Sequence, residues 1–177
     1  MPTLGIILAI SVGIFIGFIL PRIASFTMTV HQGYVLYSVG VAAGMIVVLA
    51  VSIMRVFNFE FTSHNYWGHE YTNLLTIMFG AIFVVFILLG TIIKKKSFVN
   101  AFKMCHYSGR AITDFVVREG FESTLVNMGL LGILSLGFVR AVGAPINGPV
   151  LGAIITIVGF GGFGNTLKNV AYIFVGG

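Results

Sequence analysis

The chain carries little charge for its length. Only 8% of its 177 residues are Asp, Glu, Lys or Arg, and 58% are apolar. Soluble domains contain about 25% charged residues, which cover their surface. A chain of this size cannot hide so much apolar surface in a core that water surrounds. The composition therefore excludes an ordinary soluble domain and predicts a protein whose partner is the lipid bilayer.

The chain has only one cysteine, and it also lacks the residue patterns of metal sites and nucleotide-binding loops. The single cysteine, Cys105, excludes an internal disulfide and a cysteine-based metal cluster. His64 and His69 stand five apart, which misses the spacing of a helical metal-binding pair. The glycine-rich run at 159–164 lacks the strand and helix context of a nucleotide-binding loop. We therefore expect no cofactor, no bound metal and no enzymatic activity.

What the chain does have is a series of uncharged runs. A membrane-spanning helix needs roughly 17–25 apolar residues. Four runs meet this length, and each is bounded by charged or helix-breaking residues such as Pro21 and Ser123. The sequence therefore predicts an all-α fold, a single polytopic transmembrane helix bundle, with spans at 4–20, 33–54, 74–93 and 124–142.

A fifth apolar run, 146–163, is interrupted at both ends. Pro149 stands near its start, and glycines crowd its end. Its length leaves two interpretations equally open, a spanning helix or a re-entrant or broken helix. A last apolar run, 170–177, is too short to span. It favours a fragment of a longer protein.

The net charge of +5 indicates an orientation in the membrane rather than binding of nucleic acid. Cytoplasmic loops of membrane proteins are enriched in Lys and Arg. The connection between the third and fourth spans is the most basic, with Lys94, Lys95, Lys96, Lys103, Arg110 and Arg118. We therefore place this connection in the cytoplasm and the N-terminus outside. Its apolar residues also predict a surface-lying amphipathic helix, broken near Gly109, with Asp114 paired to Arg110 or Arg118.

Small residues recur every four positions in the first two spans. The first span carries Gly5, Ala9, Gly13 and Gly17, and the second carries Gly40 and Gly44. Such stripes let helix backbones approach closely in lipid. They favour a compact bundle or a homo-oligomer.

The candidate binding site is the region after the fourth span. Irregular backbone at membrane depth occurs only where protein covers it or where it lines a cavity. We predict a helix break at Asn147, Gly148 and Pro149, with polar groups supplied by Thr156, Asn165, Lys168 and Asn169. Arg140 either extends to the interface or faces an anionic solute. Asn127 lies inside the fourth span. These features predict part of a transporter, permease or channel for a small solute, and the alternative is a structural or scaffold membrane protein.

Several segments of the second half resemble a known family. They are 108–116, 127–132, 147–152 and 158–169. Together they are similar to an uncharacterised family of bacterial multi-pass membrane proteins, the domain of unknown function 1576. The likeness is close in the second half and rests on hydropathy alone in the first helices. It implies a multi-pass protein of the bacterial inner membrane and names no substrate.

Overall fold

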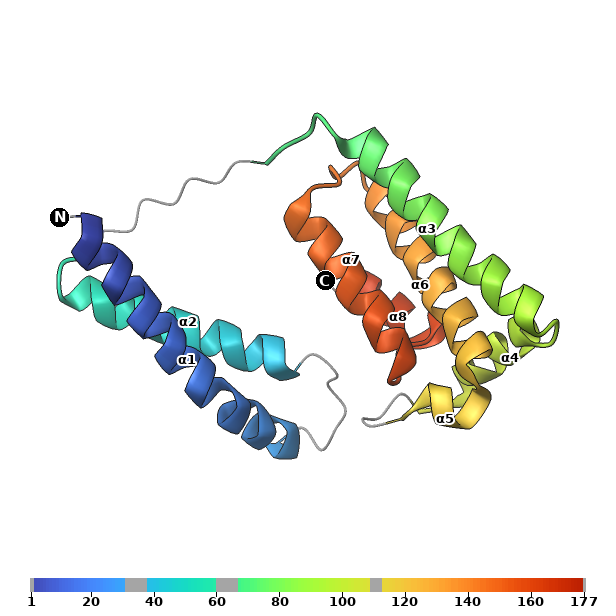
Figure 1. Cartoon of the computed structure of the whole chain (residues 1–177), viewed down its shortest axis with the longest axis horizontal. Helices are drawn as coiled ribbons and strands as arrows, with labels where there is room; N and C mark the ends of the chain where they lie inside the picture. Colours follow the sequence, from blue (N-terminus) through green and yellow to red (C-terminus); the bar gives the residue numbers. More distant parts are fainter. Residues whose placement is uncertain (1, 31–37, 60–66, 109–112, 177) are drawn as a thin grey trace. The chain divides into compact units, whose positions relative to one another are not determined.

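The computed structural model describes residues 2–30, 38–59, 67–108 and 113–176. Every regular element in these ranges is a helix, so the predicted all-α class is confirmed (Figure 1). The chain divides into two compact units, Met1–His64 and Asn65–Gly177. We call them unit 1 and unit 2 and describe each by itself.

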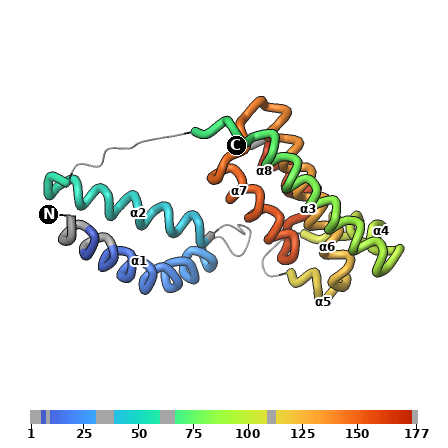
Figure 2. The backbone as a smooth tube through the Cα atoms, turned by 45° about the horizontal axis from the view of Figure 1, so that its top comes forward, coloured from blue at the N-terminus to red at the C-terminus, as the bar shows by residue number. Residues whose placement is uncertain are grey.

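Unit 1 is a pair of helices, α1 (Pro2–Val30) and α2 (Ser38–Val56), which pack against each other along their length (Figure 2). The helix α1 continues through Pro21 and Arg22 to Val30, beyond the predicted end of the first span at residue 20. Helices in lipid tolerate an internal proline, since nearby groups can satisfy the freed carbonyl. The predicted start of the second span at 33–37 lies outside the described residues.

Within the described ranges, four helices are long and apolar enough to cross a membrane. They cover Ile10–Val30, Val39–Val56, Thr72–Ile93 and Phe121–Ala141. The last two, α3 and α6, lie at the positions of the predicted spans 74–93 and 124–142, with boundaries that differ by a few residues. These helices indicate a multi-pass membrane protein.

Unit 2 is built around α6 (Phe121–Ala141), which runs antiparallel to α3 (Thr72–Ile93) (Figure 1). The other elements of unit 2 are short helices, and most of them contact α6, on which Ile133 and Leu134 stay exposed. In chain order these are α4 (Ser97–Lys103), η1 (Met104–His106), α5 (Phe115–Glu119), α7 (Gly148–Gly159), η2 (Phe160–Gly162) and α8 (Leu167–Gly176). An apolar core joins α3, α6 and α7 through residues such as Phe83, Leu136 and Ile154.

Close helix approach occurs in unit 2 and not at the predicted glycine stripes. A Cβ atom on Gly129 would lie 2.6 Å from the carbonyl oxygen of Phe83, and one on Gly90 would lie 2.4 Å from that of Glu122. These glycines therefore let α3 and α6 touch through their backbones. A Cβ atom added at Gly13, Gly17, Gly40 or Gly44 would have nothing within 4 Å. At these four glycines the predicted close packing is thus not made within unit 1, and Gly5 and Ala9 lie outside the residues whose side-chain surroundings are described.

The basic connection in unit 2 does not form the predicted amphipathic surface helix. It contains separate short helices, and Phe115, expected on the lipid side, is completely buried. Asp114 caps α5, because its side chain accepts a hydrogen bond from the Val117 amide at 3.1 Å, and it forms no ion pair with Arg118, the predicted partner that the structure describes. Arg118 lies over the ring of Tyr107, 5.2 Å from its centre. Arg110 and the predicted break at Gly109 lie outside the described residues.

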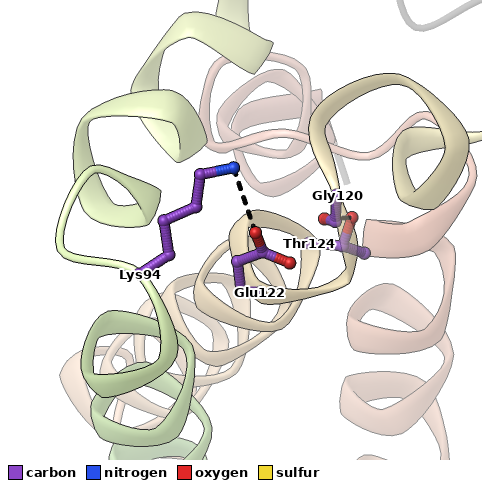
Figure 3. Close-up of polar contacts among 4 residues, drawn as sticks. All are labelled: Lys94, Gly120, Glu122 and Thr124. Carbon is purple, nitrogen blue, oxygen red and sulfur yellow. Dashed lines mark hydrogen bonds and ion pairs between the residues drawn. The ribbon is translucent and has the colours of Figure 1, made fainter.

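The start of α6 also differs from the prediction. Its N-cap is Gly120, whose φ of 87° is a conformation that suits glycine, and Ser123 lies inside the helix. Figure 3 shows this first turn. The Thr124 hydroxyl donates to the Gly120 carbonyl at 3.0 Å, and Lys94 pairs with Glu122 at 3.1 Å. The ion pair ties the start of α6 to the end of α3.

Candidate functional site

The predicted break at Asn147 is the start of a helix. Asn147 is the N-cap of α7, and its side-chain oxygen accepts a hydrogen bond from the Val150 amide at 3.2 Å. Asparagine is favoured at this position because it satisfies a free amide of the first turn. Pro149 stands in that first turn, where its missing N–H costs nothing. Asn147 is buried, whereas Gly148 and Pro149 are exposed.

A second interruption lies at the other end of α7. After η2 the backbone leaves the helical path at Phe163 and resumes it in α8 at Leu167. The side-chain amide of Asn165, which is 1% exposed, donates to the Ile157 carbonyl at 3.1 Å. Asn169 accepts from the Thr166 amide at 2.7 Å and donates to the Gly164 carbonyl at 2.8 Å. The two asparagines thus satisfy backbone groups that the interruption releases from helical bonding.

Asn127, on the neighbouring helix α6, forms hydrogen bonds with the backbone of this interruption. Its side-chain nitrogen donates to the carbonyl oxygens of Gly161 at 2.9 Å and of Asn165 at 2.8 Å. The Asn127 side chain is completely buried. Gly161 can pack closely on α6 because glycine has no Cβ atom. A Cβ atom at this position would lie only 2.9 Å from the Leu131 side chain. We call Asn127, Gly161, Asn165 and Asn169 the break cluster.

The predicted site residues fall into two groups rather than one. Asn147, Gly148 and Pro149 lie at the start of α7, which follows the end of α6 that carries Arg140. Asn165, Lys168 and Asn169 come after the end of α7. The 12 residues of α7 separate the groups by about 18 Å. Only Asn165 and Asn169 enter the break cluster.

The other predicted polar groups point away from it. Thr156 is exposed, and its hydroxyl donates to the Gly152 carbonyl of its own helix at 2.8 Å. Lys168 and Arg140 are also exposed. Their sequence positions beside the interruptions were therefore a poor guide to the direction of their side chains.

Asn127 was noted in the sequence and left out of the predicted site. Its position within a span was the usable signal, because a polar side chain there needs a partner. The partners could not be named from the sequence, since they lie 34 and 38 residues further along the chain.

The break cluster consists of neutral amides and backbone carbonyls. Among the described residues, no group of three His, Cys, Asp or Glu side chains could hold a metal ion. Such a set of dipoles can bind a polar or ionic species, but it offers no nucleophile and no acid–base pair. Outside the spans, the Tyr107 hydroxyl donates to the Glu119 carboxylate, and this hydrogen bond raises the pKa of Tyr107 above its ordinary value.

Comparison with known proteins identifies the family. The profile of a family described as "Protein of unknown function (DUF1576)" matches residues 1–56 and 93–177. The chain belongs to this family. The resemblance found in the second half is thereby confirmed. The family profile also matches residues 1–56, for which the sequence had shown only a similar hydropathy. No curated protein and no solved structure matches the chain.

Proposed function

We propose that this protein is part of a non-enzymatic transporter or channel for a small solute, and that the break cluster forms the site at which the solute interacts with the protein. One observation carries the proposal. Two short helices, α7 and α8, are separated by irregular backbone that protein covers and that the amide of Asn127 holds. Discontinuous helices of this kind offer free backbone dipoles to ions and solutes in many transporters.

The length of α7 supports this interpretation. At 1.5 Å per residue its 12 residues extend about 18 Å, well short of the roughly 30 Å hydrocarbon core. If α7 enters the membrane, its end therefore lies at depth, where lipid cannot satisfy the exposed backbone groups. The burial of Gly161, Gly162, Asn165 and Thr166 provides the cover that such a location requires.

The scaffold alternative is supported by a different observation, the backbone contact of α3 and α6 at Gly90 and Gly129. Tight packing of this kind serves assembly and needs no solute. Under the scaffold alternative, substitutions in the break cluster change folding and leave no transport to lose.

A flux assay separates the two functions. The full-length protein is reconstituted in liposomes, and uptake of labelled amino acids, sugars, carboxylates and inorganic ions is compared with protein-free vesicles. We expect uptake of at least one class, a loss of about tenfold or more in Asn165→Ala, and wild-type uptake in Thr156→Val, whose side chain is exposed. The absence of uptake across the panel by a folded, monodisperse protein would contradict the proposal.

The proposed orientation has the basic end of unit 2, with Lys94 and Lys103, in the cytoplasm and the N-terminus outside a bacterial inner membrane. Cys105 allows a direct test, because it is the only cysteine and lies in η1 at this end. We expect a membrane-impermeant maleimide to label Cys105 in inverted vesicles and not in intact cells. A cysteine introduced at exposed Tyr71, in a Cys105→Ser background, should show the opposite pattern.

A further inference from the structure

One buried oxygen in the break cluster has no partner. The Asn127 side-chain nitrogen makes two hydrogen bonds, whereas its oxygen Oδ1, completely buried, has none within the described part of the chain. The two carbonyls that receive the nitrogen fix which way the amide faces, since turning it over would place oxygen against oxygen. A buried acceptor without a donor is energetically costly.

A second such oxygen lies one helical turn away. The hydroxyl of Ser123 is completely buried and also lacks a partner among the described residues. Residues four apart on a helix share a face, with Cβ atoms about 5–6 Å apart. A single atom-sized species can therefore touch both Ser123 and Asn127. A third unpartnered oxygen belongs to Ser97 on α4, which packs against α6.

Thr72, at the start of α3, also has a buried hydroxyl without a partner in the described part of the chain, but Ser123 differs from several other hydroxyls of the spans. Ser135 of the same helix is equally buried, but it donates to the Leu131 carbonyl at 2.7 Å. Thr76 and Thr91 of α3 likewise bond to carbonyls of their own helix. Ser123 lies in the first turn of α6, and the residue four positions before it, Glu119, belongs to α5. The change of direction at Gly120 thus leaves this hydroxyl free for another partner.

From these oxygens we infer that unit 2 binds a monovalent alkali cation between Asn127 and Ser123, behind the helix interruption. The Oδ1 atom only accepts, so it requires a positive or hydrogen-donating species and excludes an anion. Divalent cations prefer carboxylates, whereas neutral amide, hydroxyl and carbonyl oxygens suit Na⁺ in broken-helix transporters. Of the carboxylates close to Ser123 in the sequence, Glu122 is paired with Lys94, and Glu119 accepts a hydrogen bond from the Tyr107 hydroxyl. A role for this cation in driving transport rests on the proposed function. The binding of the cation to unit 2 does not depend on that function.

Thermal unfolding in detergent tests the site. Choline chloride is replaced stepwise by NaCl, KCl or LiCl at constant ionic strength, and the midpoint is recorded for the full chain. A cation that binds only the folded state should raise the midpoint by about 5–10 °C at a hundredfold excess over its Kd. One alkali cation should be more effective than the others, because a site without water selects by size.

Ser123→Ala and Ser135→Ala form a matched pair. Both remove a buried hydroxyl from α6, and neither touches the hydrogen bonds of the Asn127 nitrogen. We expect Ser123→Ala to weaken the apparent cation affinity by about tenfold or more and Ser135→Ala to retain it. A wild-type midpoint that is the same in all salts, as water alone at the site would give, overturns the inference. So does an equal cation response in the two variants.

The flux assay keeps the two proposals apart. Cation-dependent stability without solute uptake supports the site and contradicts the transport function. Solute uptake together with an unfolding midpoint that does not change with the cation supports the transport function and overturns the cation site.

Discussion

Unit 1 and unit 2 use the same residue types in different ways. In α2, 6% of the spanning residues are buried, whereas in α6 the share is 44%. The more buried helix is also the less apolar one, because Ser123, Asn127 and Ser135 all lie on it. Lipid cannot satisfy polar groups, so they gather where protein covers them. A lower hydropathy in one span can therefore mark the helix against which the other helices of its unit pack.

The largest difference between the units is expected for polar side chains. Asn127→Ala removes two buried hydrogen bonds that join α6 to the carbonyls of Gly161 and Asn165 in the helix interruption. We expect a loss of about 2–4 kcal/mol in the free energy of unfolding. Ser52→Ala in unit 1 should change it by less than about 0.5 kcal/mol, since its exposed hydroxyl only bonds the Val48 carbonyl of its own helix. Unfolding in detergent with increasing dodecyl sulfate measures both, and similar losses would break the comparison.

Glycine substitutions are expected to give the next largest difference. A Cβ atom on Gly129 meets the backbone of α3, and Gly129→Ala should destabilise the protein by about 1–3 kcal/mol. Gly44→Ala meets nothing within 4 Å and should be neutral or slightly stabilising, because alanine favours a helix. The same unfolding assay applies. A large loss in Gly44→Ala would mean that the stripe packs against a partner outside unit 1, and crosslinking would then show whether the partner is a second copy.

The ion pair at the start of α6 sharpens the comparison at its polar edge. Lys94, whose side chain is 50% exposed, pairs with Glu122, whose side chain is 19% exposed, so water reaches the pair mainly from the lysine (Figure 3). Exposed pairs contribute little and are screened by salt. Lys94→Met should therefore lower the unfolding midpoint by at most about 2 °C at low salt, and the difference should disappear at high salt. A larger effect that salt does not change would place this pair in a drier environment than its exposure indicates.

The smallest effect is expected at Tyr107, outside the spans. Its hydrogen bond to Glu119 raises the pKa of the hydroxyl, so the unfolded chain loses this proton at a lower pH than the folded one. The stabilisation is therefore complete below the ordinary tyrosine pKa of about 10 and is lost as the pH rises through the raised value. The midpoint difference between wild type and Tyr107→Phe should stay constant from about pH 6 to 9 and shrink above about pH 10. A difference that stays the same above about pH 10 would contradict a raised pKa of Tyr107 in the folded state.

The candidate site was only partly predictable. Asn165 and Asn169 were expected near an interruption and take part in one, whereas Thr156 and Lys168 are exposed. Asn147 was expected to mark a break in the site and instead caps a helix. Sequence position indicates which residues are near an interruption. It does not indicate which way a side chain points when the helices on either side have turned.

The membrane class, the all-α fold and the spans of α3 and α6 follow from the sequence alone. They depend on local properties, the length of an uncharged run and the need of its backbone to bond internally in lipid. Only the tertiary structure decided that α1 passes through Pro21, that Gly129 and not Gly44 makes a close contact, and that Asn127 holds the interruption after α7. These outcomes depend on partners far along the chain. No local pattern encodes such a partner, because the same glycine or amide is stable against lipid, a neighbouring helix or an irregular loop according to what the fold places beside it.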